Sequence, residues 1–289
     1  MPAETSRIQK GIEFATQLRI PEAEDAFRIA LREDPESIEA RLLLARILLL
    51  KAQTAEADQL LDEVLKRQPQ NGEAFALKGI GCMNMGDFHG AIVLLERANN
   101  QKASQDLVCY GLTRSYRNVG NLVAAESSAR RAVQFDPKNH EAFSELGSVL
   151  WRSGKIEEAI QALLQSIRVN PAFVKGYLIL SRVYCAAGFA DLADKLCREG
   201  LRHVPDAIAL HEELCQISIE RKDHASAYRE AVEVAVRRQG YSDFVRLGDC
   251  ASKIGAADKA GQAYGRAMQL NPDRTEAFEK LTGLHERNS

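Results

Sequence analysis

Apolar residues in this chain of 289 residues recur at spacings of three and four positions, in short segments separated by turn residues. Residues 140–173 show the pattern most clearly, with two successive stripes: Phe143, Leu146 and Leu150, then Ala159, Ile160, Leu163 and Ile167. Apolar side chains at this spacing lie on one face of an α-helix. The pattern therefore predicts two amphipathic helices in this segment.

Three residues around these stripes predict where the two helices begin and end. Asn139 stands just before the first stripe, where its side chain can cap a helix N-terminus. Gly154 follows the first stripe, in the place where a left-handed residue ends a helix. Pro171 follows the second stripe and cannot continue the helical hydrogen bonds. The segment is therefore predicted to be a helix-turn-helix hairpin.

The same hairpin pattern repeats along the whole chain. Successive differences are 34 six times and then 33 in one series of alanines: 23, 57, 91, 125, 159, 193, 227 and 260. Prolines keep this period at 35, 69, 137, 171, 205 and 272, and glycines keep it at 86, 120, 154, 188 and 255. Several residue types locked to one period indicate an array of similar supersecondary units.

Small residues at two further places explain how such units can stack. One place on the first helix holds Gly11, Ala45, Gly79, Thr113, Gly147, Ser181, Cys215 and Gly248. One on the second helix holds Ala30, Val64, Ala98, Ala132, Ser166, Gly200, Val234 and Ala267. Helices cross closely only where the contacting side chains are small. A larger residue at Ala159, in the alanine series, should overpack its crossing by about 1–3 kcal/mol.

This 34-residue hairpin, with its small residues and closing proline, resembles the tetratricopeptide repeat. The resemblance implies an all-α fold, a right-handed superhelical α-solenoid that forms a single domain over residues 1–289. Eight repeats are expected at 4–37, 38–71, 72–105, 106–139, 140–173, 174–207, 208–240 and 241–274. A last helix, 275–287, with Phe278, Leu281 and Leu284 on one face, is expected to cap the array.

Some repeats depart from the pattern. Leu18 and Lys222 stand where other repeats have the glycine between helices, and Gln239 stands where a proline is usual. The seventh repeat is also one residue shorter than the others, and the difference falls in the turn of residues 237–243. We expect the array to be irregular there and to act as a hinge.

Composition excludes some classes of function. The formal charge of −2 provides no electrostatic case for nucleic-acid binding. The first residues lack a signal peptide's apolar segment, and the longest apolar run, residues 42–50, contains Arg46 and is too short to span a membrane. Six cysteines without a CxxC pair favour reduced thiols. A cytoplasmic protein without a membrane span is the expectation.

The resemblance also implies a binding surface, because first helices line the concave side of tetratricopeptide arrays. By repeat phase, the groove residues predicted to contact a partner are Leu42, Leu43, Arg46, Leu49, Leu50, Leu77, Ile80, Met83, Tyr110, Arg114, Arg117, Asn118, Trp151, Arg152, Lys175 and Arg182. The same faces carry Glu73, Asn84, Glu141 and Glu145.

Two features of this set suggest a partner's character. The leucines of residues 42–50 exceed what stacking needs, and an exposed apolar strip usually marks a contact surface. Arginine and aromatic residues of repeats four to six are typical of binding hot spots. The alternatives are that Leu42 and Leu49 pack on neighbouring repeats, and that the arginines form a solvated face with Trp151 partly in the core. The expected partner is a protein or peptide segment with apolar and acidic residues.

The sequence provides weaker signals for other kinds of binding or catalytic site. The family's carboxylate clamp for chaperone tails needs lysines, asparagines and an arginine that no three consecutive repeats here supply. His211 and Cys215 have metal-ligand spacing, but Cys215 holds a stacking place and no third ligand is evident. No Ser/His/Asp set converges in the sequence. We therefore predict no catalytic site, no metal and no cofactor.

The leading hypothesis is a non-catalytic scaffold or adaptor whose concave groove binds a partner peptide or helix. Two alternatives remain open. One is a structural scaffold that assembles into a homo-oligomer through its first repeat and the leucine strip. The other is a regulatory repeat module of a larger signalling or enzyme complex.

Overall fold

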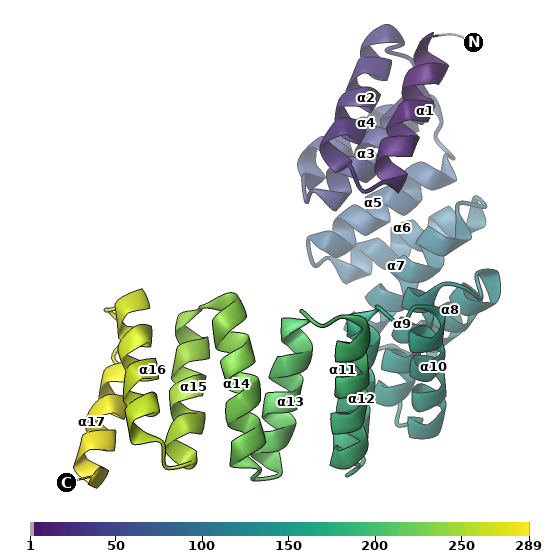
Figure 1. Cartoon of the computed structure of the whole chain (residues 1–289). Helices are drawn as coiled ribbons and strands as arrows, with labels where there is room; N and C mark the ends of the chain where they lie inside the picture. Colours follow the sequence, from purple (N-terminus) through teal and green to yellow (C-terminus); the bar gives the residue numbers. More distant parts are fainter. Residues whose placement is uncertain (1–2, 289) are drawn as a thin grey trace. The chain divides into compact units, whose positions relative to one another are not determined.

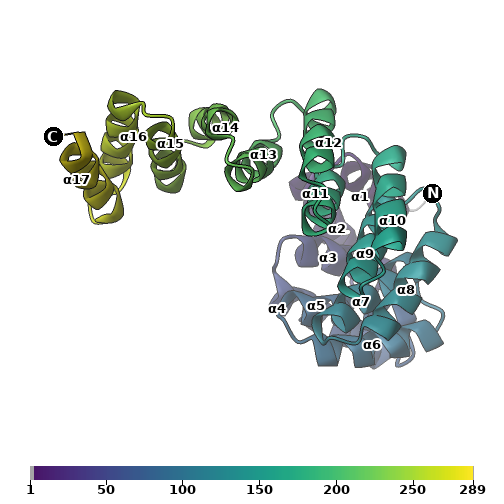
Figure 2. The same ribbon diagram turned by 90° about the horizontal axis from the view of Figure 1, so that it is seen from below.

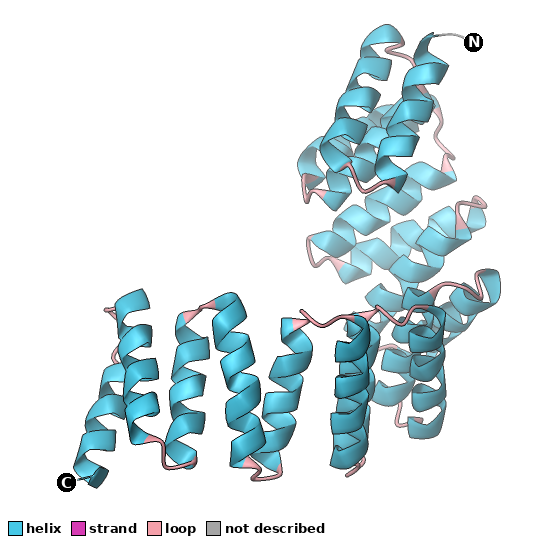
Figure 3. Cartoon of the chain, viewed as in Figure 1, coloured by secondary structure: helices cyan, strands magenta, loops and turns pink. Residues whose placement is uncertain are grey.

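The computed structural model describes the backbone of residues 3–288 and the side chains of residues 6–284. Every regular element within this range is an α-helix (Figures 1 and 3). The all-α class and the helical hairpins predicted from the sequence are therefore confirmed. By its contacts the chain forms two compact units, Met1–Gly154 and Lys155–Ser289, which are described separately.

The helices follow the predicted repeats closely. The first unit contains α1 (Ala3–Thr16), α2 (Ile20–Glu33), α3 (Ile38–Leu50), α4 (Thr54–Arg67), α5 (Gly72–Asn84), α6 (Phe88–Asn100), α7 (Gln105–Asn118), α8 (Leu122–Phe135) and α9 (His140–Arg152). The second contains α10 (Ile156–Val169), α11 (Val174–Ala186), α12 (Ala190–His203), α13 (Ile208–Glu220), α14 (His224–Arg238), α15 (Tyr241–Lys253), α16 (Ala257–Leu270) and α17 (Glu276–Asn288).

The turn inside each hairpin has the same backbone conformation even where glycine is absent. One residue of this turn has a positive φ in all eight repeats: Leu18, Ala52, Gly86, Gly120, Gly154, Gly188, Lys222 and Gly255. Glycine adopts this left-handed conformation without steric cost, whereas a residue with a Cβ costs roughly 1–2 kcal/mol. The packing of the two helices therefore fixes the conformation of the turn. The intrinsic backbone preference of the turn residue has a smaller influence.

The turns between hairpins depend on proline. Asp34, Asp136 and Asn170 precede prolines and have φ near −130°, at −132°, −130° and −136°. A residue before proline avoids the helical region, so the helix stops there. Where proline is missing, the chain leaves the helix through a left-handed residue instead, Lys102 at φ 57° and Gln239 at φ 54°. The irregularity predicted for residues 237–243 is thus present, while the hinge stays a prediction.

A glycine at the crossing inside a hairpin packs against a large side chain of the second helix. A Cβ placed on Gly11 would lie 2.4 Å from the Phe27 ring, and one on Gly248 would lie 2.4 Å from Tyr264. The same two places hold Ala45 and Leu61, Thr113 and Ala129, Ser181 and Cys197, or Cys215 and Ala231. In each of these pairs the first helix contributes a small residue, whereas the second contributes a large one in some hairpins and a small one in others. The small residue on the first helix allows the two helices to approach closely.

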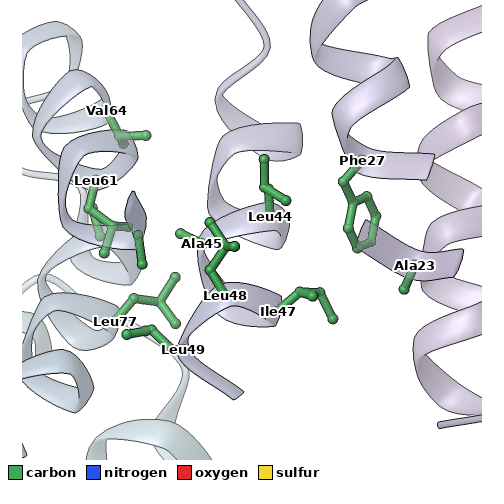
Figure 4. Close-up of a cluster of buried hydrophobic side chains, with 12 residues drawn as sticks. Ala23, Phe27, Leu44, Ala45, Ile47, Leu48, Leu49, Leu61, Val64 and Leu77 are labelled. Carbon is green, nitrogen blue, oxygen red and sulfur yellow. The ribbon is translucent and has the colours of Figure 1, made fainter. Parts of the chain in front are cut away.

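The largest apolar cluster of the first unit packs α2, α3, α4 and α5 together. Figure 4 shows part of it, where Leu44 and Leu48 of α3 lie between Phe27 of α2 and Leu61 of α4. Leu44, Leu48 and Leu61 are at most 2% exposed. The half-buried Leu42 and Leu43 pack against this cluster from its edge. Stacking therefore uses part of the leucine run and leaves the rest at the surface.

The last helix of the second unit packs as a cap, with one correction to its predicted face. Helix α17 lies against α16 at the end of the row α15, α16, α17 (Figure 2). Ala277 is fully buried there, with Leu281 and Leu284 beside it. Phe278, predicted to share this face, is 54% exposed. The helix is rotated so that its small residue meets α16 closely, and the phenylalanine points away.

Candidate binding groove of the first unit

The first helices α3, α5 and α7 contact one another in sequence order and form one wall of the first unit. A hollow of about 660 Å³ lies over this wall. Its apolar lining comes from all three helices: Leu49, Leu50, Leu77, Ile80, Met83, Leu107 and Tyr110. A second hollow of about 380 Å³ adjoins it and shares Arg46, Leu77 and Leu107. We call the two hollows together the apolar groove.

The apolar groove has a buried floor and an exposed edge. Leu49, Leu77 and Met83, predicted as partner contacts, are only 4–6% exposed because the helices bury most of each side chain against one another. Leu50 is 70% exposed, and Ile80 is half-buried. A partner would therefore meet the tips of the floor residues and the open side chain of Leu50. The open alternative for Leu49, packing on a neighbouring repeat, is what the structure shows.

Leu42 and Leu43 line the second hollow, together with Ile38. Both leucines are half-buried, since one side of each packs against the core and the other faces the hollow. A leucine that packs on the core with one side is held in position, and its other side provides apolar contact area for a partner. The groove residues predicted on α3 and α5 are thus brought together.

Carboxylates dominate the charged lining of the apolar groove. Glu39, Glu73, Asp106 and Glu141 line it, and Arg46 is the cation among its lining residues. The four carboxylates stand in the first turns of α3, α5, α7 and α9, where an acidic residue also complements the helix dipole. Glu73 accepts a hydrogen bond from the Ser104 backbone nitrogen at 2.6 Å. Repeat phase had indicated Glu73 and Glu141 but missed Glu39, Asp106 and Leu107.

The arginines of α7 are held by the first unit itself. Arg117 donates to Glu145 at 2.5 Å and to the Ser148 hydroxyl at 3.2 Å. The side chains of Arg117 and Glu145 are only 17% and 6% exposed. Burial of both groups makes this pair part of the packing between α7 and α9. The pair was not foreseen, because the sequence places Arg117 on the groove face without showing its partner.

Arg114 and Asn118 are also engaged within α7. The Arg114 guanidinium lies 5.4 Å from the centre of the Tyr110 ring and donates to the Tyr110 hydroxyl. Asn118 donates to the Arg114 carbonyl oxygen at 2.8 Å. Tyr110 therefore links Arg114 to the rim of the apolar groove, which its ring lines.

The remaining predicted residues are not among those that line the apolar groove. Trp151 is half-buried and Arg152 is exposed, and neither lines the hollows. Lys175 and Arg182 belong to α11 of the second unit, where both are exposed. Arg182 pairs with Glu213 of α13 at 3.4 Å. The groove residues predicted in repeats five and six are therefore not part of the hollow of the first unit.

Metal and thiol chemistry receives no support at the candidate positions. Cys215 is fully buried, and its Sγ donates to the Ala227 carbonyl oxygen at 3.5 Å, as a core cysteine would. His211 instead contacts Glu230, with 2.8 Å between Nδ1 and Oε2. Among the residues whose placement is described, no group of three His, Cys, Asp or Glu side chains is arranged to hold a metal ion. Burial also raises the pKa of the Cys197 thiol to about 12, which suppresses its reactivity.

Comparison with known proteins agrees with the repeat architecture. Residues 17–79 match the tetratricopeptide repeat family, and residues 49–172 match the N-terminal tetratricopeptide-repeat region of Psidin. The structure of the human IFIT1 dimer with m7Gppp-AAAA aligns with a TM-score of 0.68. It is 17% identical and covers 94% of this chain, which covers 73% of it. At this identity the likeness shows the fold alone.

The chain is a tetratricopeptide-repeat protein. Among curated relatives, human protein O-mannosyl-transferase TMTC1 is 26% identical over 179 residues, which are 60% of this chain and 20% of the relative. A DnaJ homolog subfamily C member 7 homolog of Schizosaccharomyces pombe is 24% identical over 227 residues, 72% of this chain and 42% of the relative. The chain thus spans less than half of either relative. Within the described residues, no helix has the length and apolarity to cross a bilayer.

Proposed function

We propose that this protein is a non-catalytic interaction scaffold or adaptor, and that the apolar groove of the first unit binds a segment of a partner polypeptide. One observation carries the proposal. Three successive first helices leave an apolar hollow of about 660 Å³ that side chains of the described unit do not fill. Open apolar surface of this kind usually marks a contact site.

The shape of the lining favours a polypeptide over a small molecule. The two hollows adjoin through Arg46, Leu77 and Leu107, so the apolar surface continues from α3 to α7. A long apolar strip with a polar rim suits an amphipathic helix or extended segment that places several side chains along it. A cytoplasmic location accompanies the proposal, supported by six cysteines that are all free thiols.

A random-peptide display selection against the immobilised full chain tests this function. Selected peptides are then measured by fluorescence anisotropy against a double variant, Leu50→Asn and Ile80→Asn, which removes apolar contacts without adding charge. The two side chains should together contribute about 2 kcal/mol, so binding should weaken about 30-fold. A selection that yields no peptide sensitive to this variant would reject the proposed function.

A matched control separates the groove from general surface apolarity. Val93 of α6 and Val123 of α8 are also exposed apolar residues of the first unit, at 68% and 83%, but lie on second helices. The double variant Val93→Asn and Val123→Asn should bind selected peptides as the wild type does. Circular dichroism of both double variants should match the wild type, since the residues changed are exposed or half-buried.

The self-assembly alternative makes a different prediction. If the apolar groove joined copies of this chain, light scattering would show a mass that rises with concentration, and Leu50→Asn with Ile80→Asn would abolish the rise. The proposed function predicts a mass of 32.0 kDa at every concentration measured. The two roles are therefore separated by one titration.

A further inference from the structure

The charges around the apolar groove specify a partner more closely than its apolar lining does. We propose that the segment bound in this groove is basic as well as apolar, and that its lysine side chains meet the carboxylates on the rim. This inference rests on the proposed function. It reverses the sign of charge expected from the sequence, where the arginines of repeats four to six had suggested acidic partner residues.

The first argument is the balance of charge on the lining. Glu39, Glu73, Asp106 and Glu141 line the groove together with Arg46, and the Arg114 guanidinium lies 5.4 Å from the centre of the Tyr110 ring. Carboxylates still outnumber guanidinium groups when both arginines are counted. In the part of the chain that the structure describes, Asp106 and Glu141 are exposed and form no ion pair. They are therefore available to a cation from outside the chain.

The second argument is that Arg117 is already neutralised. It was the strongest candidate for holding an acidic partner, yet its guanidinium lies 2.5 Å from Glu145 in a largely buried pair. Binding an external carboxylate there would require breaking this pair and exposing Glu145. Removing one partner from a buried pair is unfavourable by several kcal/mol. An acidic segment would thus meet the carboxylates of Asp106 and Glu141, whereas the Arg117 guanidinium is already bound to Glu145.

The third argument is a small recess at the end of the groove. Asp106, Tyr110 and Glu141 line both the groove and this recess of about 30 Å³. Its other charged lining residues are Asp136 and Glu145, and no lysine or arginine lines it. The volume holds about one small polar group. An ammonium group fits such a space, whereas a carboxylate would meet the negative charges of Asp106, Asp136 and Glu141.

The charged composition of selected peptides tests the inference directly. Peptides whose binding depends on Leu50 and Ile80 should contain more lysine and arginine than the unselected library, together with apolar residues. An excess of aspartate and glutamate, or no difference from the library, would overturn the inference. The proposed function would survive that result, because dependence on the groove residues is measured separately.

A selected basic peptide then allows a test on the rim. The double variant Asp106→Asn and Glu141→Gln should weaken its binding about 3- to 10-fold at low salt and reduce the dependence of binding on ionic strength. In the control, Glu157→Gln in α10 and Asp258→Asn in α16 remove charge from first-turn positions of the second unit. That control should change binding less than about 2-fold. Equal affinities for the two double variants would contradict the proposal.

Discussion

The two units are built from the same repeat but treat the faces of their first helices differently. In the first unit, α3 carries more leucines than stacking needs, and an apolar groove remains open over α3, α5 and α7. In the second unit, the corresponding faces of α11 and α13 combine the half-buried Leu178 and Ile179 with polar residues that bond among themselves. Arg182 contacts Glu213, and Gln216 donates to Glu220 at 2.8 Å. The repeat residues that the two units share thus fix the fold. The other residues on the faces of the first helices determine whether an open apolar surface is left for a partner.

The largest effect expected from this comparison concerns two ion pairs that join successive first helices. Arg117 of the first unit pairs with the buried Glu145, while Arg182 of the second pairs with Glu213 and is 60% exposed. Arg117→Ala should lower the free energy of unfolding by about 3 kcal/mol, because it removes the Arg117 guanidinium from a buried ion pair. Arg182→Ala should lower it by less than about 1 kcal/mol. Urea denaturation of the two variants measures both, and similar losses would break the comparison.

The next effect tests the packing that both units share. Gly248→Ala places a methyl group 2.4 Å from the Tyr264 ring position and should destabilise the second unit by about 1–3 kcal/mol. Gly265→Ala in α16 meets no atom within 4 Å and should be neutral or slightly stabilising. Thermal melts followed by circular dichroism distinguish them. If Gly248→Ala were neutral as well, the absence of a side chain at Gly248 would not be what sets the spacing of α15 and α16.

A smaller effect concerns the turn between α14 and α15, where the repeat lacks both proline and one residue. Asp243 is buried and accepts from Arg238 at 2.8 and 2.5 Å and from the Gly240 nitrogen at 3.1 Å. Burial, the largest single influence, opposes ionisation, but the hydrogen bonds from Arg238 and the Gly240 nitrogen, with the charges of Arg238 and Arg246, together hold the pKa of Asp243 below its ordinary value. Asp243→Asn should therefore lower the free energy of unfolding by about 1–2 kcal/mol at pH 7.

The sign of the pH dependence follows from that lowered pKa. A carboxyl with a depressed folded-state pKa stabilises the fold above its unfolded pKa of about 3.9, and this contribution disappears as pH falls through the folded pKa. The difference between wild type and Asp243→Asn should accordingly be constant from pH 7 to about pH 5 and shrink below about pH 4. Urea midpoints over this range provide the measurement. A difference that grew on acidification would contradict the assignment.

The smallest effect is a gain in stability in each unit. Leu18 in the first and Lys222 in the second hold the left-handed turn position that glycine holds in other repeats. Leu18→Gly and Lys222→Gly should each raise the free energy of unfolding by about 0.5–1 kcal/mol, since glycine adopts this conformation without strain. Both side chains are exposed, so little packing is lost. Denaturation midpoints that fall in either variant would show that the side chain stabilises its turn.

The fold was largely predictable because the same pattern of small, turn and apolar residues recurs in each repeat. Alanines, glycines and prolines in one phase marked hairpin boundaries to within a few residues, and Leu18 and Lys222 kept the glycine conformation although their identities argue against it. The last helix shows where periodicity alone fails. Its pattern favoured Phe278 for the buried face, yet the close approach of α16 selects the smaller Ala277.

The groove was predictable only in part, for a physical reason. Repeat phase correctly brought Leu50, Ile80 and Tyr110 to one surface, because helix periodicity fixes the direction of a side chain. It could not show that Arg117 reaches Glu145, 28 residues away, since that depends on side-chain length and on how closely α7 and α9 approach. The ion-pair partner of a long charged side chain depends on the three-dimensional arrangement of the helices, which repeat phase does not provide. The sign of the partner's charge is therefore where our proposal departs from the sequence-based expectation.

Hydrogen exchange of the full chain, with and without a selected groove-dependent peptide, tests the central claim most directly. The account predicts slower amide exchange in α3, α5 and α7 when the peptide is bound, and no change in α11 and α13. Protection confined to the second unit, or none in α3, α5 and α7, would contradict the claim that the apolar groove of the first unit is the binding surface.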